Sequence, residues 1–196
     1  MLENWEKSSA SDEMRYYTKN ESGRFYCDET GRLTYFEPVG VNCLHQGPYG
    51  FRRSHEKRAL HSLLIPEGIR EINYHTEDLR DLIVVEKLVL PASLEKLDEG
   101  VLSGCLIMEM ELPASLREIG PGALMCNYIH VLRIPKGMLH PKCADWGQKK
   151  AAGALTIHGR QFKETIINTL IVPRDYPYQK LMVETKINNV VYSDEN

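Results

Sequence analysis

The chain has 196 residues, of which 42% are hydrophobic, and its formal net charge at pH 7 is −3. This length can bury a core as one elongated domain or as two small ones. Acidic and basic residues are mixed along the chain and leave no basic field, so we expect no nucleic-acid partner. No apolar run approaches the roughly 18 residues of a transmembrane helix, so we also expect no membrane span.

Residues 1–14 are polar and acidic, and they include neither the basic nor the apolar stretch of a signal peptide. We therefore expect a cytoplasmic protein. The alternative is a secreted or cell-surface protein whose leader has been removed. The five cysteines are odd in number and widely spaced, which favours free thiols over a disulfide framework.

Residues 1–59 lack the repeat that follows, and we predict that they form a β-rich N-terminal cap. Runs of aromatic and β-branched residues at 15–19, 24–27 and 33–38 are separated by turn residues, a pattern typical of a β-meander or of hairpins. A solenoid needs such an atypical unit because its first turn would otherwise expose an apolar edge.

Residues 60–140 repeat themselves. LVLPASLEKLDEGVLSGC is followed by MELPASLREIGPGALMC and then by LRIPKGM, so that Pro91, Pro113 and Pro135 fall 22 residues apart. Pro66 precedes the first of them by 25 residues. A period in this range predicts a solenoid of leucine-rich units.

Stacking the units on their prolines aligns apolar residues into ladders. Each apolar-x-apolar-Pro sequence is expected to form a short strand, with the outer two side chains inward and the middle one outward. Proline ends the strand because it has no N–H to donate. The predicted inward ladders are Leu63, Leu88, Met110 and Leu132; Ile65, Leu90, Leu112 and Ile134; Ile69, Leu94, Leu116 and Met138; and Ile72, Leu97 and Ile119.

Residues 141–196 break the period, and we predict a distorted terminal turn followed by a C-terminal cap. The apolar-Pro signal returns in TLIVP at Pro173, 38 residues after Pro135, which corresponds to one turn plus an insertion. We expect a last strand after residue 185, helices over 148–152 and 161–168, and a strand over 154–158.

The repeated units resemble the BspA-like, type 5 leucine-rich repeats found mostly in bacteria and in some protozoa. The matching residues are Pro91, Ser93, Leu94, Leu97, Val101, Leu102 and Cys105 in one unit; Pro113, Ser115, Leu116, Ile119, Gly120, Ala123, Leu124 and Cys126 in the next; and Pro66, Ile69 and Ile72 in an earlier one. The resemblance implies an α/β leucine-rich-repeat solenoid of short stacked parallel strands with non-repeat N- and C-terminal caps. It also implies a bacterial protein with a non-enzymatic interaction surface, which some relatives display on the cell for adhesion.

The cysteines suggest structural roles. Cys105 and Cys126 are expected to occupy equivalent positions and to stack as small buried residues. Cys43 with His45, and His140 with Cys143, have metal-like spacings, but neither pair has a second pair at zinc-finger distance, so we expect no metal.

No phosphate-binding, nucleophile-elbow or zinc-protease motif is present, so we expect no cofactor, no catalytic residue and no enzyme. A Cys–His nucleophile pair assembled in space stays open as a less favoured alternative, with its site between the cap and the solenoid.

The outward strand positions are the candidate protein-binding residues. One row is Leu64, Val89, Glu111 and Arg133, and Lys87, Glu109 and Val131 lie two residues earlier on the same face. Mixed apolar and charged rows of this kind are surfaces that solenoids use for protein partners. The alternative is that Glu111 and Arg133 only pair with each other across adjacent turns.

A second candidate surface is aromatic and basic. Its residues are Tyr16, Tyr17, Phe25, Tyr26, Tyr35, Phe36, Tyr49, Phe51, Arg52 and Arg53. Most of these aromatic side chains are expected in the core of the cap, and the last four residues are expected in an exposed loop. The sequence as a whole predicts a non-catalytic protein–protein interaction module for an unidentified protein partner. The alternative is a secreted or cell-surface adhesion module.

Overall fold

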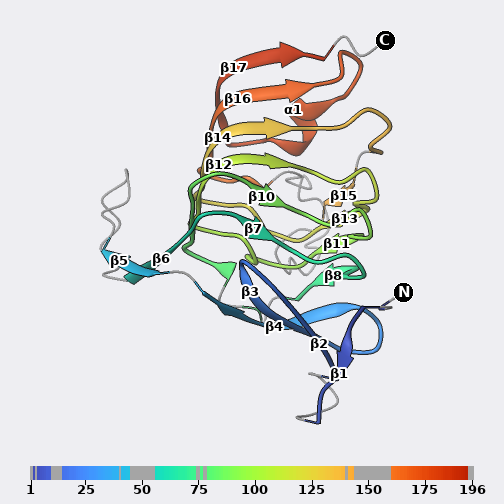
Figure 1. The fold of residues 1–196 in the computed structure, drawn as a ribbon. Helices are drawn as coiled ribbons and strands as arrows, with labels where there is room; N and C mark the ends of the chain where they lie inside the picture. The colour runs from blue at the N-terminus through green and yellow to red at the C-terminus, as the bar shows by residue number, and fades with distance from the viewer. Residues whose placement is uncertain are drawn as a thin grey trace, which may run out of the picture.

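The computed structural model describes residues 2, 4–9, 15–39, 41–44, 56–73, 76, 79–139, 141–143 and 160–193. Within these residues the chain is a β-solenoid of about five turns, built mostly from parallel strands. Figure 1 shows the turns stacked on one another, with the N-terminal strands at one end of the stack and the C-terminal strand at the other. Two sheets line the coil, and the core lies between them.

The longer sheet has nine strands in the described part of the chain, all parallel except for one antiparallel pair, β5 and β6. Its members are β5 (Val41–Leu44), β6 (Glu56–Leu60), β7 (Leu63–Leu64), β9 (Ile83–Val84), β10 (Leu88–Val89), β12 (Leu106–Glu111), β14 (Tyr128–Arg133), β16 (Ile166–Val172) and β17 (Lys186–Tyr192). Both β9 and β10 pair with β12, because one turn is interrupted between them where β12 is continuous.

The other sheet has eight strands among the described residues and joins the N-terminal region to the solenoid. Its members are β1 (Glu6–Lys7), β2 (Tyr16–Asn20), β3 (Gly23–Cys27), β4 (Arg32–Pro38), β8 (Glu71–Ile72), β11 (Lys96–Leu97), β13 (Glu118–Ile119) and β15 (Lys142–Cys143). The predicted meander is confirmed, because β2, β3 and β4 are antiparallel neighbours. Strand β4 then pairs with β8 in parallel and continues the sheet of the solenoid. The domain divisions at residues 59 and 140 stay predictions, and hydrogen-bonded pairs cross both of them.

The core follows the predicted ladders. Leu88 pairs with Leu63 on one side and with Met110 on the other, and Met110 pairs with Leu132. The same ladder continues into Leu170, so burial extends beyond the predicted units. All of these side chains are at most 2% exposed. Each contributes roughly 1.5–3 kcal/mol of burial free energy, and every turn depends on its neighbours for that burial.

A column of residues with left-handed backbone conformation forms one corner of the coil. The angle φ is positive at Asp81, Gly104, Cys126, Glu164 and Glu184, with values between 56° and 74°. The N–H groups of the first four donate to carbonyl groups of the following turn, at N–O distances between 2.9 and 3.1 Å. This corner therefore ties each turn to the next.

Cys126 belongs to that corner column, and Cys105 does not. In the register of β12 and β14, Cys105 is the equivalent of Asn127. Cys105 is 2% exposed, whereas Cys126 is half-buried. The prediction that the two cysteines occupy equivalent positions is wrong, because Cys126 takes the position that Gly104 holds one turn earlier.

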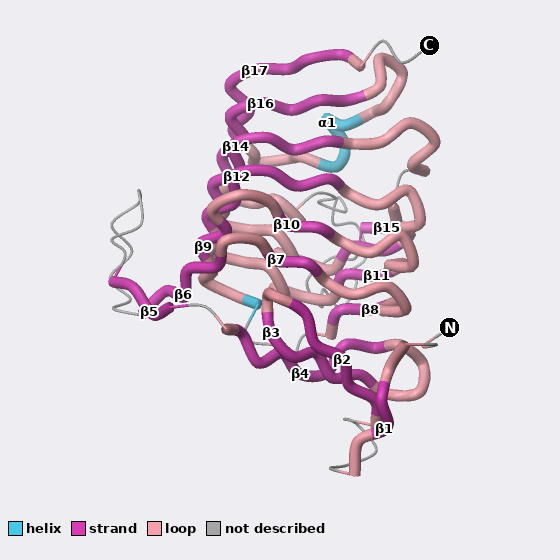
Figure 2. Tube along the Cα trace, in the orientation of Figure 1, coloured by secondary structure: helices cyan, strands magenta, loops and turns pink. Residues whose placement is uncertain are grey.

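The α/β class is not confirmed, because the described residues contain a single helix of four residues, α1 (Tyr178–Leu181). Figure 2 shows strands and loops elsewhere in the described chain, apart from one very short helical turn before β9. The helix predicted over 161–168 is wrong: residues 161–164 form a turn, and β16 begins at Ile166. The helix predicted over 148–152 and the strand predicted over 154–158 lie outside the described residues. No described helix has the length and apolar character needed to cross a bilayer.

Candidate functional site

The seven predicted protein-binding residues lie together on the outer face of the longer sheet. Leu64 is opposite Val89, Val89 is opposite Glu111, and Glu111 is opposite Arg133. The remaining three are Lys87, Glu109 and Val131, of which Glu109 and Val131 pair with each other. Lys87, Val89, Glu109 and Glu111 are exposed, whereas Leu64, Val131 and Arg133 are half-buried.

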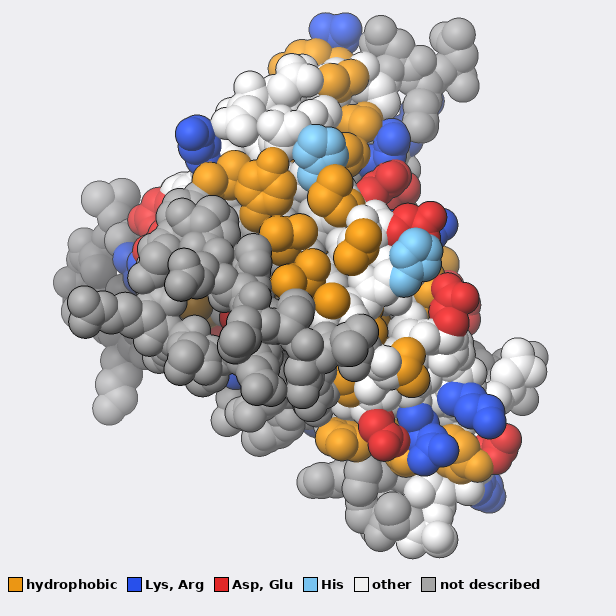
Figure 3. All heavy atoms as spheres, turned by 60° about the vertical axis from the view of Figure 1, so that its left-hand side comes forward, with side chains coloured by type: hydrophobic (Ala, Val, Ile, Leu, Met, Phe, Trp, Pro, Cys, Tyr) orange, Lys and Arg blue, Asp and Glu red, His pale blue; other side chains and the backbone are white. Residues whose placement is uncertain are grey.

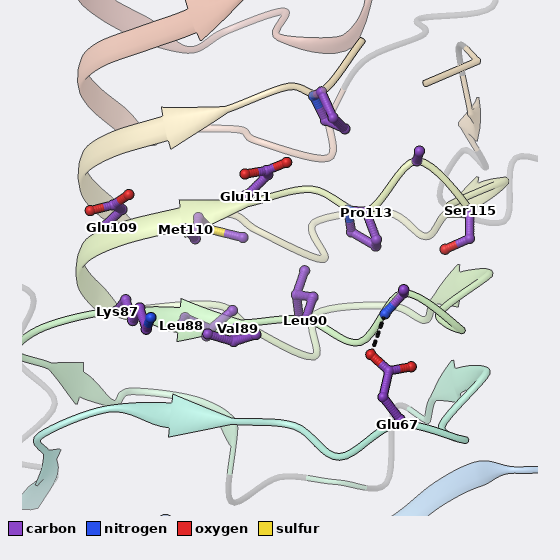
Figure 4. Close-up of a pocket in the computed structure, with 13 residues that line it drawn as sticks. Glu67, Lys87, Leu88, Val89, Leu90, Glu109, Met110, Glu111, Pro113 and Ser115 are labelled. Atoms are coloured by element: carbon purple, nitrogen blue, oxygen red, sulfur yellow. Dashed lines mark hydrogen bonds between the residues drawn. The ribbon is translucent and has the colours of Figure 1, made fainter. Parts of the chain in front are cut away.

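A hollow of about 510 Å³ opens on this face, and four of the seven residues line it: Lys87, Val89, Glu109 and Glu111. The other lining residues are Glu67, Leu88, Leu90, Ala92, Met110, Pro113, Ala114, Ser115 and Pro135. Figure 4 shows that the hollow spans several turns and lies where the strands run into their prolines. The structure therefore joins part of the predicted row to the turns at the carboxyl ends of the strands.

The hollow exists because small residues follow the prolines in its middle turns. The position after each proline is filled by Glu67, Ala92, Ala114 and Lys136 in successive turns. A methyl group at the two middle positions leaves open the space that a longer side chain would fill. In both middle turns the chain reverses tightly: Leu94 N–H donates to Pro91 O at 3.1 Å, and Leu116 N–H donates to Pro113 O at 3.0 Å.

The Glu67 carboxylate closes one of these turns. It accepts a hydrogen bond from Ala92 N–H at 2.8 Å, the dashed line in Figure 4, and another from Ser93 N–H at 3.3 Å. The serine hydroxyls hold the turns in register, because Ser93 Oγ donates to Ile69 O at 2.8 Å and Ser115 Oγ donates to Leu94 O at 2.6 Å. The wall of the hollow is thus fixed by hydrogen bonds that run from turn to turn.

The charges on this face are only partly paired. Arg133 Nε lies 3.4 Å from Glu109 Oε1, so the partner of Arg133 is Glu109 and not Glu111. Both side chains of that pair are about half exposed, and such a pair contributes little to stability. Among the described residues, neither Lys87 nor Glu111 has an ion-pair partner. The hollow therefore offers one free ammonium group and one free carboxylate.

Cys27, Cys105 and Cys126 are free thiols. Burial raises the pKa of Cys27 to about 12, with a smaller contribution from Asp28. Burial also raises the pKa of Cys126, and the neighbouring Glu164 carboxylate, whose Oε2 lies 3.7 Å from Sγ, raises it further. Both thiols are therefore protonated at neutral pH, the form that is poorly nucleophilic.

No group of three or more potential metal ligands occurs within the described residues. His45 and His140, which complete the two metal-like spacings, lie outside them.

The second candidate surface divides between core and exterior. Phe25 and Phe36 are fully buried, and their rings stack at a centroid distance of 4.5 Å. Tyr26 lies in register between Tyr17 and Tyr35 on the outer face of the meander, with ring centroids 6.0 and 5.6 Å apart. Tyr16 is half-buried against the core. The predicted exposed residues Tyr49, Phe51, Arg52 and Arg53 lie outside the described residues.

Sequence reasoning missed an apolar strip on the side of the stack where the long strands begin. Ile83, Leu106, Tyr128 and Ile166 stand in one register row, and each is half-buried. Figure 3 shows apolar side chains gathered along this side of the molecule. The alignment on prolines covered only the carboxyl end of each strand, so it did not predict whether these residues face inward or outward.

Sequence reasoning also missed the contributions of Glu67, Ala92, Ala114 and Ser115 to the hollow. The signal that could have found them is the tripeptide at each proline, which reads PEG, PAS, PAS and PKG in successive units. Comparison with known proteins finds no matching family model, no matching curated protein and no matching solved structure.

Proposed function

We propose that this chain is a leucine-rich-repeat solenoid of the BspA-like kind, and that it acts as a non-catalytic protein-interaction module. An unidentified protein partner binds on the outer face of the longer sheet. The observation that carries the proposal is the hollow of about 510 Å³ at the predicted outward row, where Lys87, Val89, Glu109 and Glu111 line one surface.

The chemistry of the hollow suits a protein segment. Val89 is 36% exposed and supplies apolar area above a floor formed by Leu90, Met110 and Pro113. Free charges of opposite sign, Lys87 and Glu111, lie beside that floor and can orient a partner. An apolar centre with charged groups around it is the usual composition of a protein–protein interface.

The test is capture and affinity measurement with matched charge reversals. The purified chain is immobilised, partners are captured from a lysate of the source organism, and the affinity of an identified partner is measured by calorimetry. Glu111→Lys is expected to weaken binding by at least tenfold. Glu99→Lys makes the same charge change on an exposed glutamate outside the hollow, and it is expected to bind like the wild type.

Melting temperatures of the two variants that equal that of the wild type show that folding is unaffected. If Glu111→Lys and Glu99→Lys bind the partner equally well, the hollow is not the binding surface and the proposal fails.

A further inference from the structure

We propose that the backbone N–H groups of Ala114 and Ser115 bind a carboxylate of the partner, supplied by an aspartate or glutamate side chain within an extended segment. This inference rests on the proposed function and names the chemistry by which the partner is held. The two residues line the hollow directly, next to Pro113.

The molecule itself contains the model for this contact. One turn earlier, the equivalent residues Ala92 and Ser93 donate both of their N–H groups to the Glu67 carboxylate, at 2.8 and 3.3 Å. The two turns share two further hydrogen bonds, and in the first of these the N–H of the fourth residue donates to the proline carbonyl oxygen. Each also anchors its serine hydroxyl to a carbonyl oxygen of the preceding turn. The same backbone geometry is therefore presented twice.

The N–H groups of the second turn, which contains Ala114 and Ser115, have no acceptor. Among the described residues, nothing accepts a hydrogen bond from Ala114 N–H or from Ser115 N–H. The side chain that would supply an acceptor belongs to Ala92, the equivalent of Glu67, and it ends at Cβ. The space that the Glu67 side chain takes in one turn is therefore open in the next, and it forms part of the hollow.

Basic side chains near this turn offset part of the acidic lining of the hollow. Arg117 Nη1 lies 2.7 Å from Ala114 O on the same turn, Lys136 follows the next proline, and Lys87 lines the hollow without an ion-pair partner. Three carboxylates line the hollow: Glu67 is hydrogen-bonded to Ala92 N–H and Ser93 N–H, Glu109 is paired with Arg133, and Glu111 is free. Two N–H donors on one carboxylate form charge-assisted hydrogen bonds, which are stronger than neutral ones.

The occupant is a side chain rather than a chain terminus because of the shape of the site. The carboxylate that binds the equivalent pair of N–H groups is itself a glutamate side chain. The lining continues on both sides of Ala114 and Ser115, from Lys87 and Glu67 to Pro135, so a bound segment can extend in both directions.

The first test uses acetate as the probe and amide NMR of the full chain as the readout. Sodium acetate is titrated against sodium chloride at equal ionic strength. The amide protons of Ala114 and Ser115 are expected to move downfield in a saturable manner, by more than any other backbone amides. Absence of that shift, or an equal shift with chloride, overturns the proposal.

Two variants make the result specific. Glu67→Ala removes the internal carboxylate, so Ala92 N–H and Ser93 N–H become acetate-responsive in the same way and report that the probe works. Ala92→Glu places a carboxylate where Glu67 stands one turn earlier, so the response at Ala114 and Ser115 disappears. This variant is also expected to melt about 2–4 °C above the neutral control Ala92→Gln. If the Ala92 and Ser93 amides of Glu67→Ala respond to acetate and the wild-type pair at Ala114 and Ser115 does not, the proposal is wrong.

The captured partner separates this inference from the proposed function. Ala92→Glu is expected to lower the affinity for the partner by at least tenfold, as Glu111→Lys does. If Glu111→Lys lowers the affinity for the partner and Ala92→Glu does not, the proposed interaction face is supported and the proposed carboxylate site is wrong. If Glu111→Lys has no effect while the acetate response is present, the proposed function falls and the carboxylate site stands. Loss of binding on amidating the partner's C-terminus would overturn the assignment to a side chain.

Discussion

Cys27 gives stability a dependence on pH. Its thiol is fully buried at the end of β3, and its pKa is raised from the ordinary value of 9.0 to about 12. Between these values the unfolded chain has lost the thiol proton while the folded chain still holds it. The folded state then binds more protons, so the free energy of unfolding falls as pH rises, by about 1.4 kcal/mol per pH unit.

Urea unfolding of the wild type and of Cys27→Ala, below pH 9.0 and between pH 9.0 and about 12, measures this dependence. The wild type is expected to lose stability more steeply with rising pH than the variant. The constant cost of the shortened side chain cancels in this comparison of slopes, and the raised pKa of Cys126 is common to both proteins. Parallel slopes would contradict the assignment.

Asn127 stabilises the coil through a buried amide. Its side chain is fully buried, accepts a hydrogen bond from Cys105 N–H at 2.7 Å, and donates one to Leu102 O at 2.9 Å. Asn127→Ala leaves a buried N–H and a buried carbonyl without partners and is expected to cost about 1–3 kcal/mol. Asn188→Ala removes an exposed amide and is expected to change stability by no more than about 0.5 kcal/mol. Equal denaturation midpoints for the two variants would refute the role of Asn127.

The misplacement of Cys126 shows why residue-scale prediction failed at the corner. Left-handed backbone conformation favours glycine, yet only Gly104 among the five residues of that column is a glycine. Asp81, Cys126 and Glu164 adopt the same conformation because hydrogen bonds from their N–H groups to the next turn hold them there. Glu184 adopts it in the last turn, where its carbonyl oxygen accepts the hydrogen bond from Glu164 N–H. The prediction matched the two cysteines because they fall at similar places in the repeated sequence. The second unit is one residue shorter between its proline and its cysteine, so its corner position is occupied by Cys126 and not by the residue before it.

At the scale of the corner element, a comparison of Gly104 with Gly137 separates the cost of backbone strain from the cost of a steric clash. Gly104 and Gly137 both have positive φ, 74° and 81°. A Cβ at Gly104 would lie 2.3 Å from Asp81 Oδ1, whereas a Cβ at Gly137 would meet no atom within 4 Å. Gly137→Ala is therefore expected to cost about 1–2 kcal/mol from the backbone alone. Gly104→Ala is expected to cost about 1–3 kcal/mol more, because the Asp81 side chain must move.

A double-mutant cycle checks the steric part. In the presence of Asp81→Ala, the cost of Gly104→Ala is expected to fall to that of Gly137→Ala, as measured by chemical denaturation. If Asp81→Ala leaves the cost of Gly104→Ala unchanged, the steric explanation is wrong.

Elements whose sequence period matches the turn length could be predicted, and the others could not. The ladders through Leu88 and Leu97 followed from stacking the prolines, because each strand repeats its inward residues at a constant spacing. The region over 161–168 follows an insertion, since Pro173 comes 38 residues after Pro135 instead of 22. There, pairing with β14 decides the structure: the β-branched Ile166, Ile167 and Thr169 form a strand beside it.

The candidate site was predictable only in the part that depends on alternation. Lys87, Val89, Glu109 and Glu111 followed from their outward positions on short strands. The roles of Ala114 and Ser115 depend on backbone N–H groups, and whether those groups are occupied is decided by the length of a side chain one turn earlier. A single-unit pattern does not show that relation, since it becomes visible only when Glu67 and Ala92 are compared as equivalents.

At the scale of the whole molecule, stability is a sum of contacts between neighbouring turns, so position in the stack decides how far a defect spreads. The ladder that contains Leu132 also contains Leu170 and Val190. Leu132 is fully buried between two turns, whereas Val190 is half-buried on β17, which has a described neighbour on one side only. Truncation of Leu132 and of Val190 therefore compares a defect inside the stack with a defect near its end.

Leu132→Ala is expected to destabilise the protein by about 2–5 kcal/mol, because the cavity it leaves lies between β12 and β16. Amide hydrogen exchange should then accelerate in the strands on both sides. Val190→Ala is expected to cost less, and to accelerate exchange in β17 and in the N–H groups that β16 and β17 share, while β12 retains its protection. Exchange that accelerates equally in β12 for both variants would mean that the turns unfold as one cooperative unit, and the nearest-neighbour description of this solenoid would be wrong.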